Sequence, residues 1–167
     1  MGASDRFEVE DVRRLSPALV VSHGYRRIVR PDVIDLLEGR IYNVHISLLP
    51  YGRGADPNLW SILDDTPSGV TVHEMDKGLD TGRIVLQSEV ELDDSVDTLR
   101  TSYNRLQEEA VRLFAAGWIR LLAGEVRPVI QSGPGTEHRS TDKNSVLHLL
   151  EQGWDTPIKS LRGRAPR

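Results

Sequence analysis

The sequence predicts an α/β domain of three layers around a mixed, mostly parallel sheet. The first observation is the order strand, helix, strand over residues 18–25, 31–39 and 41–49, which implies a right-handed crossover between parallel strands. The second is a pair of alternating, β-branched-rich runs farther along the chain, and the third is a long helical pattern after them. The chain has 167 residues, which is the size of one domain.

The amino-terminal elements are bounded by proline and glycine. Apolar residues at roughly helical spacing predict a short helix over 7–16 that Pro17 ends. The apolar run ALVVSHGY then predicts a buried strand that delivers a loop at its carboxyl end. Pro31 at the start and Gly39 past the end predict a helix between them.

A hairpin and a long helix complete the predicted sheet layer. Residues 69–75 and 83–92 alternate, and the glycine-rich loop DKGLDTG joins them. The pattern from 95 to 122, with Gly124 as its stop, predicts a helix that packs on the sheet. Its expected apolar face is Val96, Leu99, Tyr103, Leu106, Ala110, Leu113 and Phe114.

We divide the chain into a domain at 1–130 and a carboxyl-terminal extension at 131–167 packed on it. After Pro128 the composition of QSGPGTEHRSTDKN is that of a loop, and a short amphipathic piece follows at 145–151. The last residues, KSLRGRAPR, are basic and are expected to form a mobile tail.

Composition excludes several classes of function. The net charge of -4 and the pI near 5.7 argue against nucleic acid as the main partner. The absence of cysteine excludes disulfides, thiol catalysis and thiolate metal sites. No apolar run approaches the ~20 residues that a membrane span needs, so we expect a cytoplasmic protein with no membrane partner.

The strand at 41–49 carries three polar side chains on one face. Side chains two apart share a face, so Asn43, His45 and Ser47 point one way. A strand that faces solvent, or a core histidine bonded by a neighbour, would explain them without function. The Leu49-Pro50 stop at a strand end favours a crevice instead, because ligands bind at the carboxyl ends of such strands.

An amide and an imidazole side by side suit the donation of hydrogen bonds to an oxygen that gains charge as a carbonyl is attacked. A carboxylate that handles protons is still needed, and Asp80 in GLDTG is the best candidate. Spacing alone also fits an ordinary turn aspartate there.

A series of ordered motifs resembles one enzyme family. The series is Asn43-x-His45-x-Ser47-x-Leu49-Pro50, then Gly52, Gly54, Pro57 and Trp60, then Gly69-Val70-Thr71 and Gly78-Leu79-Asp80-Thr81-Gly82. It resembles the catalytic half of the folate-dependent formyltransferases, a family that includes glycinamide ribonucleotide, methionyl-tRNA and sugar N-formyltransferases. The resemblance runs from about Ala18 to Leu92 and implies a Rossmann-like core.

The resemblance implies formyl transfer from 10-formyltetrahydrofolate, a co-substrate, to the amine of a small molecule, with a nucleotide-linked amino sugar as one candidate. No metal is implied. Asn43 and His45 would polarise the formyl carbonyl, and Asp80 would accept a proton and hold the imidazole or a water in place. The folate-binding residues implied by the family are His23, Gly24, Tyr25, Arg26, Arg27, Ile28, Leu49, Pro50, Met75, Asp76, Gly78, Leu79 and Asp80.

The sequence also departs from the family. Catalytic domains of the family begin with further βα units, and residues 1–17 hold no glycine-rich phosphate motif. We therefore expect a core that lacks its first units, either as a truncation or with that wall supplied by another subunit or by the tail. Edges left exposed would favour a homodimer.

The residues after Leu122 are too few for a tRNA-binding domain, so none is expected; His138, Arg139 and Lys143 are candidates for an anionic acceptor. Two alternatives stay open. One is a formyltetrahydrofolate hydrolase, and the other is a non-catalytic folate-binding remnant or fragment.

Overall fold

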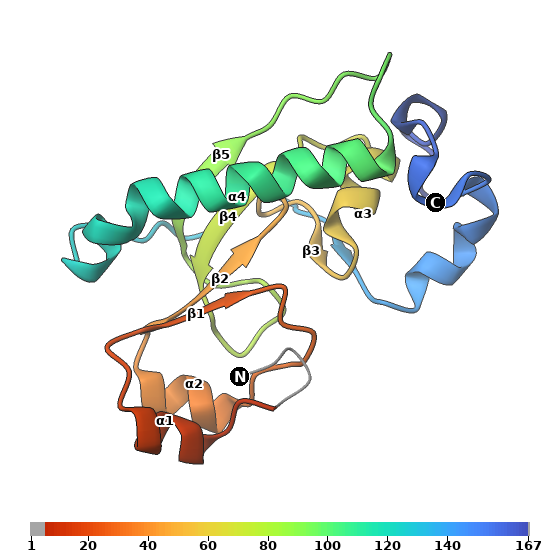
Figure 1. The fold of residues 1–167 in the computed structure, drawn as a ribbon. Helices are drawn as coiled ribbons and strands as arrows, with labels where there is room; N and C mark the ends of the chain where they lie inside the picture. Colours follow the sequence, from red (N-terminus) through yellow and green to blue (C-terminus); the bar gives the residue numbers. More distant parts are fainter. Residues whose placement is uncertain (1–5, 167) are drawn as a thin grey trace.

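A computed structural model describes residues 6–166 as a sheet between helices (Figure 1). The four-stranded sheet has the order β1-β2-β4-β5. Its strands are β1 (Val20–His23), β2 (Ile41–His45), β4 (Gly69–Glu74) and β5 (Ile84–Glu89). The helices are α1 (Val9–Leu15), α2 (Pro31–Leu37), α3 (Pro57–Leu63) and α4 (Leu99–Leu122).

The expected mixed sheet is confirmed. β1 and β2 pair in parallel across the α2 crossover, whereas β4 is antiparallel to both β2 and β5. Three of the four strands therefore run in one direction, and β4 runs in the other. The predicted hairpin of β4 and β5 is present, with a register irregularity between Val72 and His73.

The alternation of β2 separates two cores, which gives the three expected layers. Val44 joins Val70, Val72 and Leu106 in the core under α4. Ile41 lies in the other core, between the sheet and the helices α1 and α2. The other buried residues of this core are Val12, Val29, Val33, Ile34 and Leu37. Figure 1 shows α4 on one face of the sheet and α1 and α2 on the other. Asn43 and His45 follow Ile41 on the same face of β2 but lie outside this core, so their side chains can form a site.

The long helix begins later than the sequence pattern suggests. It starts at Leu99, because Thr98 caps it: the Thr98 hydroxyl accepts from the Thr101 backbone N–H, and the Thr101 hydroxyl accepts from the Thr98 N–H. Val96 precedes this cap and is 65% exposed, so its place on the apolar face was predicted wrongly. No helix within residues 6–166 is long and apolar enough to cross a membrane.

The carboxyl-terminal segment has little regular structure, but it is packed. It holds a two-residue strand, β6 (Glu137–His138), which pairs with β3 (Arg53–Gly54), and four short 3-10 helices at Asp142–Ser145, Leu147–Leu149, Gly153–Asp155 and Ile158–Ser160. Val146, Leu149, Ile158 and Leu161 form a core with α3 and the start of α4.

Residues 159–165, part of the segment expected to be a mobile tail, are packed against the rest of the chain in this structure. Leu161 is fully buried, and Arg162 forms ion pairs with Asp94 and Asp65. The backbone N–H groups of Gly163 and Ala165 donate to carbonyls at the end of α3. Arg162 is thus paired with acidic residues, and backbone hydrogen bonds hold the segment against α3.

Candidate active site

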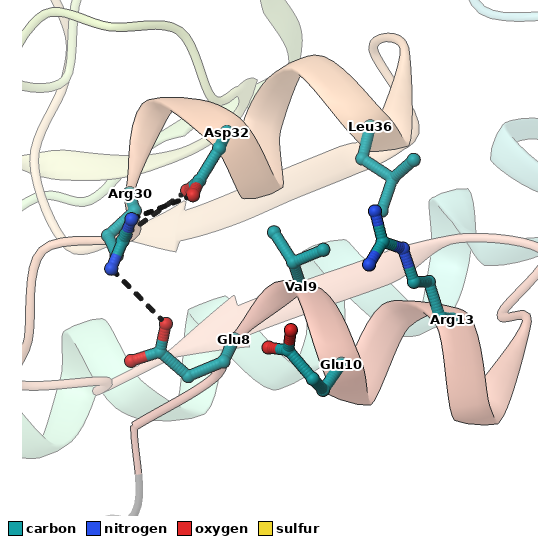
Figure 2. Close-up of a pocket in the computed structure, with 7 residues that line it drawn as sticks. All are labelled: Glu8, Val9, Glu10, Arg13, Arg30, Asp32 and Leu36. Carbon is teal, nitrogen blue, oxygen red and sulfur yellow. Dashed lines mark hydrogen bonds and ion pairs between the residues drawn. The ribbon is translucent and has the colours of Figure 1, made fainter.

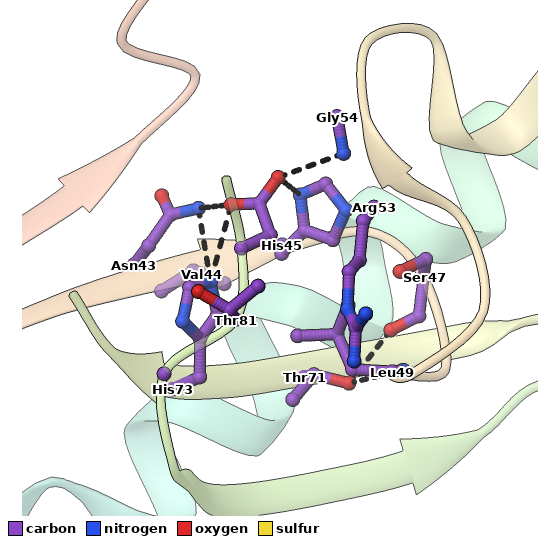
Figure 3. Close-up of polar contacts among 12 residues, drawn as sticks. Asn43, Val44, His45, Ser47, Leu49, Arg53, Gly54, Thr71, His73 and Thr81 are labelled. Atoms are coloured by element: carbon purple, nitrogen blue, oxygen red, sulfur yellow. Dashed lines mark hydrogen bonds and ion pairs between the residues drawn. The ribbon is translucent and has the colours of Figure 1, made fainter. Parts of the chain in front are cut away.

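Two neighbouring strands assemble the polar cluster. The antiparallel register sets Asn43 of β2 opposite His73 of β4, and His45 opposite Thr71 (Figure 3). Paired residues on neighbouring strands share a face, so His73 joins the predicted pair. Sequence reasoning missed His73, although the alternation of GVTVHEM places it on one face with Thr71.

The loop after β4 folds back and brings Asp80 into the cluster. The Asp80 Oδ1 atom accepts from Asn43 Nδ2 at 3.3 Å and lies 3.4 Å from His73 Nε2. Its Oδ2 atom accepts from the Gly54 backbone N–H at 2.9 Å and lies 3.8 Å from His45 Nδ1. The structure thus brings together the three residues predicted to be catalytic.

Asp80 has a left-handed backbone, with φ of 53°, which aspartate tolerates better than most residues. Asp76 shapes the turn before it, because one of its carboxylate oxygens accepts from both Gly78 N–H and the Thr81 hydroxyl. At Gly82 a Cβ would lie 1.8 Å from the Glu74 carbonyl oxygen. This loop therefore needs glycine where it meets β4.

Backbone carbonyls fix which ring nitrogen of His45 and of His73 carries the hydrogen in the neutral form. A carbonyl only accepts, so His45 Nε2–H donates to the Gly52 oxygen at 2.8 Å. A neutral His45 then carries its lone pair on Nδ1, facing Asp80. His73 Nδ1–H likewise donates to the Glu74 carbonyl at 2.7 Å, and its Nε2 faces Asn43 and Asp80.

Burial and charge set the ionisation of the cluster. Burial lowers the pKa of the His45 imidazole below the ordinary 6.5, although the Asp80 charge and the hydrogen bond to Gly52 oppose this effect. Burial alone would raise the pKa of the Asp80 carboxyl. The contact with His73, the charge that His45 carries when it is protonated, and the hydrogen bond from the Gly54 N–H outweigh it, so the pKa of Asp80 lies well below its usual range. The resting site holds an ionised carboxylate beside a neutral imidazole.

Ser47 does not join the cluster. β2 ends at His45, and the Ser47 hydroxyl is buried without a hydrogen-bond partner within residues 6–166. Its backbone carbonyl accepts from the Thr71 hydroxyl at 2.7 Å, and the Leu49 N–H donates to the same hydroxyl. The expected alternation of three polar residues therefore stops after two.

The residues predicted to bind folate come from the end of β1 and from the loops that follow β1, β2 and β4. His23 turns toward α4, where its Nε2 lies 2.8 Å from Gln107 Oε1. The Tyr25 hydroxyl accepts from the Phe7 N–H, Ile28 is 84% exposed, and the Leu49 side chain is buried. The Leu49 backbone N–H donates to the Thr71 hydroxyl and its carbonyl accepts from Gln87 Nε2, so its assignment to folate stays a prediction. The remaining assignments, Gly24, Arg26, Arg27, Pro50, Met75, Asp76, Gly78 and Leu79, stay predictions.

Two hollows lie outside this cluster. One, of about 380 Å³, opens between α1 and α2 and is lined by Glu8, Val9, Glu10, Arg13, Arg30, Asp32 and Leu36 (Figure 2). Within it, Arg30 pairs with both Glu8 and Asp32. The other, of about 200 Å³, begins at Ile46, next to His45 in the chain. Its other lining residues are Asp56, Pro57, Asn58, Leu59, Leu99, Tyr103, Lys143, Leu150, Gly153 and Trp154.

Of the three residues considered for an anionic acceptor, His138 has a structural role. Its ring stacks on Trp60, with centroids 3.7 Å apart, and its Nε2 lies 2.8 Å from Asp64 Oδ2. Lys143 pairs with Asp56 on the lining of the smaller hollow, whereas Arg139 does not line that hollow.

Comparisons with known proteins agree with this geometry. A sequence profile described as formyl transferase matches residues 2–119. A methionyl-tRNA formyltransferase of Anaeromyxobacter dehalogenans (strain 2CP-C) is 37% identical over 162 residues, which cover 92% of this chain and 48% of that protein. The chain thus spans about half the length of the curated relatives it matches.

Solved structures give the same result. The formyltransferase PseJ from Anoxybacillus kamchatkensis, in complex with UDP-4,6-dideoxy-4-formamido-L-AltNAc and tetrahydrofolate, superposes with a TM-score of 0.92 at 42% identity, over 97% of this chain and 85% of that one. The phosphoribosylglycinamide formyltransferase from Bacillus halodurans is 36% identical, with a TM-score of 0.65, over 70% of this chain and 60% of that one. With its Rossmann-like core and its cluster of Asn43, His45 and Asp80, the chain belongs to the formyl transferase family.

Proposed function

We propose that this chain transfers the formyl group of 10-formyltetrahydrofolate to the amine of a small molecule, with a nucleotide-linked amino sugar as the favoured acceptor. The observation that carries the proposal is the convergence of an amide, a neutral imidazole and an ionised carboxylate at the end of β2. The similarity to PseJ, which was solved with a formamido sugar nucleotide and tetrahydrofolate, supports both substrate classes.

Asn43 supplies the donor to the formyl oxygen. Its Nδ2 carries two N–H groups, of which one binds Asp80 Oδ1. The other points toward His73 Nε2 over 3.4 Å, a long contact, and is the group that can turn to the substrate. Loss of one such donor typically costs about 10²–10³ in rate.

The geometry favours a division of proton roles different from the one the family resemblance implies. A carboxyl whose pKa is held as low as that of Asp80 is a weak base. His45 has its one neutral-state N–H bound to Gly52, so its free Nδ1 lone pair can take a proton rather than give one. We assign proton acceptance to His45 and stabilisation of the resulting imidazolium to Asp80.

The atoms balance with this assignment. The amine nitrogen bonds to the formyl carbon, and its surplus proton passes to His45 Nδ1. The bond between that carbon and N10 of the folate then breaks, and His45 returns the proton to N10. The products are the formamide and tetrahydrofolate, with the site restored.

We propose that the nucleotide of the acceptor binds at the smaller hollow, past the end of β2. Tyr103 and Trp154 meet edge to face there with centroids 5.3 Å apart, and Trp154 is half exposed. Such aromatic surfaces bind the face of a nucleobase, typically by about 1–3 kcal/mol per base. Trp154→Ala should therefore raise KM for a nucleotide-linked amine while KM for the formyl donor stays constant.

Turnover of 10-formyltetrahydrofolate by the purified chain tests the function. Absorbance is followed alone and with a panel of nucleotide-linked 4-amino sugars, simple amines and initiator methionyl-tRNA. Loss of donor that depends on an amino sugar supports the proposal. Equal formate release without amine would show a hydrolase, and binding of 5-formyltetrahydrofolate without turnover would show a folate-binding remnant.

The expected homodimer stays a prediction. β1 is an edge strand of the sheet, so its outer backbone groups are available for pairing. Sedimentation of the chain at several concentrations measures whether two copies associate.

A further inference from the structure

One glutamine outside the predicted catalytic motifs uses its whole hydrogen-bonding capacity around Asp80. Gln131 Nε2 donates to the backbone carbonyls of Asp80 and Gly82, each at 2.8 Å. Its Oε1 accepts from Arg53 Nε at 3.0 Å and from Arg53 Nη2 at 2.7 Å. An amide has two N–H groups and two lone pairs, so all four are in use.

These partners are the two backbone segments that position the Asp80 carboxylate. Gly54, which donates to Asp80 Oδ2, directly follows Arg53 in β3. Gln131 therefore links the loop that carries Asp80 to β3, whose Gly54 N–H binds the Asp80 carboxylate. The backbone just before Gln131 is also held in place, because Val129 and Ile84 exchange two hydrogen bonds, each of 2.8 Å.

The backbone of Asp80 needs such support. Its φ of 53° lies in the left-handed region, where a residue other than glycine stays only if its surroundings hold it. Its carbonyl is held by Gln131, its carboxylate by Asn43 and Gly54. Without Gln131 the peptide after Asp80 can rotate, and the carboxylate then moves relative to His45.

We propose that Gln131, clamped by Arg53, is a positioning residue that fixes the Asp80 carboxylate for the transfer step; this inference rests on the proposed function. A displacement of about 1 Å in a catalytic group can cost about 10² in rate. Gln131 acts through the Asp80 backbone and touches no predicted catalytic side chain.

Two substitutions separate its donor and acceptor roles. Gln131→Met has a similar length and removes all four hydrogen bonds. Gln131→Glu keeps an acceptor for Arg53 but cannot donate to the carbonyls of Asp80 and Gly82. Gln152→Met, at an exposed glutamine in the carboxyl-terminal segment, is the matched control and should match the parent.

Both Gln131 variants should lose about 10²-fold in kcat, with KM for the formyl donor near that of the parent. In an Asp80→Asn background, Gln131→Met should cause no further loss, because no carboxylate remains to be placed. A kcat equal to the parent, or the same loss in both backgrounds, would overturn the proposal and leave Gln131 as a brace of the fold. The assays are run far below the thermal unfolding midpoint of each variant, so that a smaller folded fraction does not lower the measured kcat.

A second readout does not need turnover. The ring resonances of His45 are followed by NMR against pH in the parent and in Gln131→Met. A changed titration of His45 supports the proposal, and an unchanged titration overturns it. If the parent uses none of the amines, the proposed function fails while this measurement still decides the role of Gln131.

Discussion

The sheet with its crossover helix and the segment at 129–165 are built in different ways. In the sheet, periodic apolar residues bury two faces, and the polar side chains of β2 and β4 emerge between them. The carboxyl-terminal segment has short 3-10 turns and a two-residue strand, and it is held by individual hydrogen bonds and by a few buried apolar side chains. The sheet presents side chains that we propose to react, while the segment contacts the loops around them.

This difference teaches that regular structure and catalytic relevance need not coincide. Gln131 reaches the Asp80 backbone, Thr136 accepts from Gly52 N–H, and His138 pairs with β3. Gly52 in turn accepts from His45. Residues outside the predicted core thus touch both sides of the proposed proton relay.

The largest effect is expected in the sheet, at His45. His45→Ala removes the proposed proton acceptor, and general acid–base groups contribute about 10²–10⁴-fold to rate. The amine-dependent turnover of 10-formyltetrahydrofolate measures this loss. His148→Ala, at an exposed histidine in the carboxyl-terminal segment, should match the parent. Turnover of His45→Ala within a few-fold of the parent would remove His45 from the mechanism.

The next effect tests whether the carboxyl-terminal segment is part of the fold. Leu161 is fully buried against α3, so Leu161→Ala should cost about 2–5 kcal/mol in the free energy of unfolding. Leu147→Ala, at a leucine that is 51% exposed in the same segment, should change it little. Urea unfolding of both variants measures the two free energies of unfolding. Equally small decreases for both variants would show that this segment is not packed and would support a mobile tail.

Thr136 tests the link between the two regions with a smaller expected effect. Its hydroxyl accepts from Gly52 N–H at 2.8 Å, and Thr136→Val leaves that partly buried donor without its partner. An unsatisfied donor costs about 1–3 kcal/mol of stability. Thr136→Ser keeps the hydroxyl and should retain most of that stability. Equal unfolding free energies for Val and Ser would show that water replaces the hydroxyl.

The smallest effect is a displacement of the pH profile. His45 must be unprotonated to accept a proton, so kcat/KM should fall as pH falls. Burial lowers the His45 pKa, so the acid limb should have its midpoint below 6.5. Asp80→Asn removes the charge that opposes this effect, so its acid limb should lie at still lower pH, on a lower maximum. A limb above 6.5 in the parent would contradict a buried neutral His45.

The sign is the same for stability. The unfolded chain binds a proton at His45 more tightly than the folded chain, so the free energy of unfolding should decrease as pH falls below 6.5. The lowered pKa of Asp80 adds a further loss below 3.8, where the unfolded carboxyl takes up its proton.

Elements with their own local signals could be predicted from sequence. Pro31 and Gly39 bound α2, and alternation defined β4 and β5. The convergence of Asn43 and His45 followed from the two-residue period of a strand. Asp80 was a candidate carboxylate from its glycine-rich loop, and the family resemblance favoured it over an ordinary turn aspartate.

Other features depend on contacts between distant residues. The place of His73 requires the register of β2 with β4, and that of Gln131 requires the path of a segment whose composition indicates a loop. β3 and β6 have two residues each, too few for a period to appear. α3 was not predicted, although Pro57 opens it and its apolar residues are buried.

The most direct test follows the formyl carbon itself. The chain is incubated with 10-formyltetrahydrofolate labelled at that carbon and with a UDP-linked 4-amino sugar, and the products are analysed by mass spectrometry. The account predicts a labelled formamido sugar nucleotide, heavier than the acceptor by one CO unit, formed by the parent and nearly absent with His45→Ala. Label found in free formate, or in no product while the folate still binds, would contradict it.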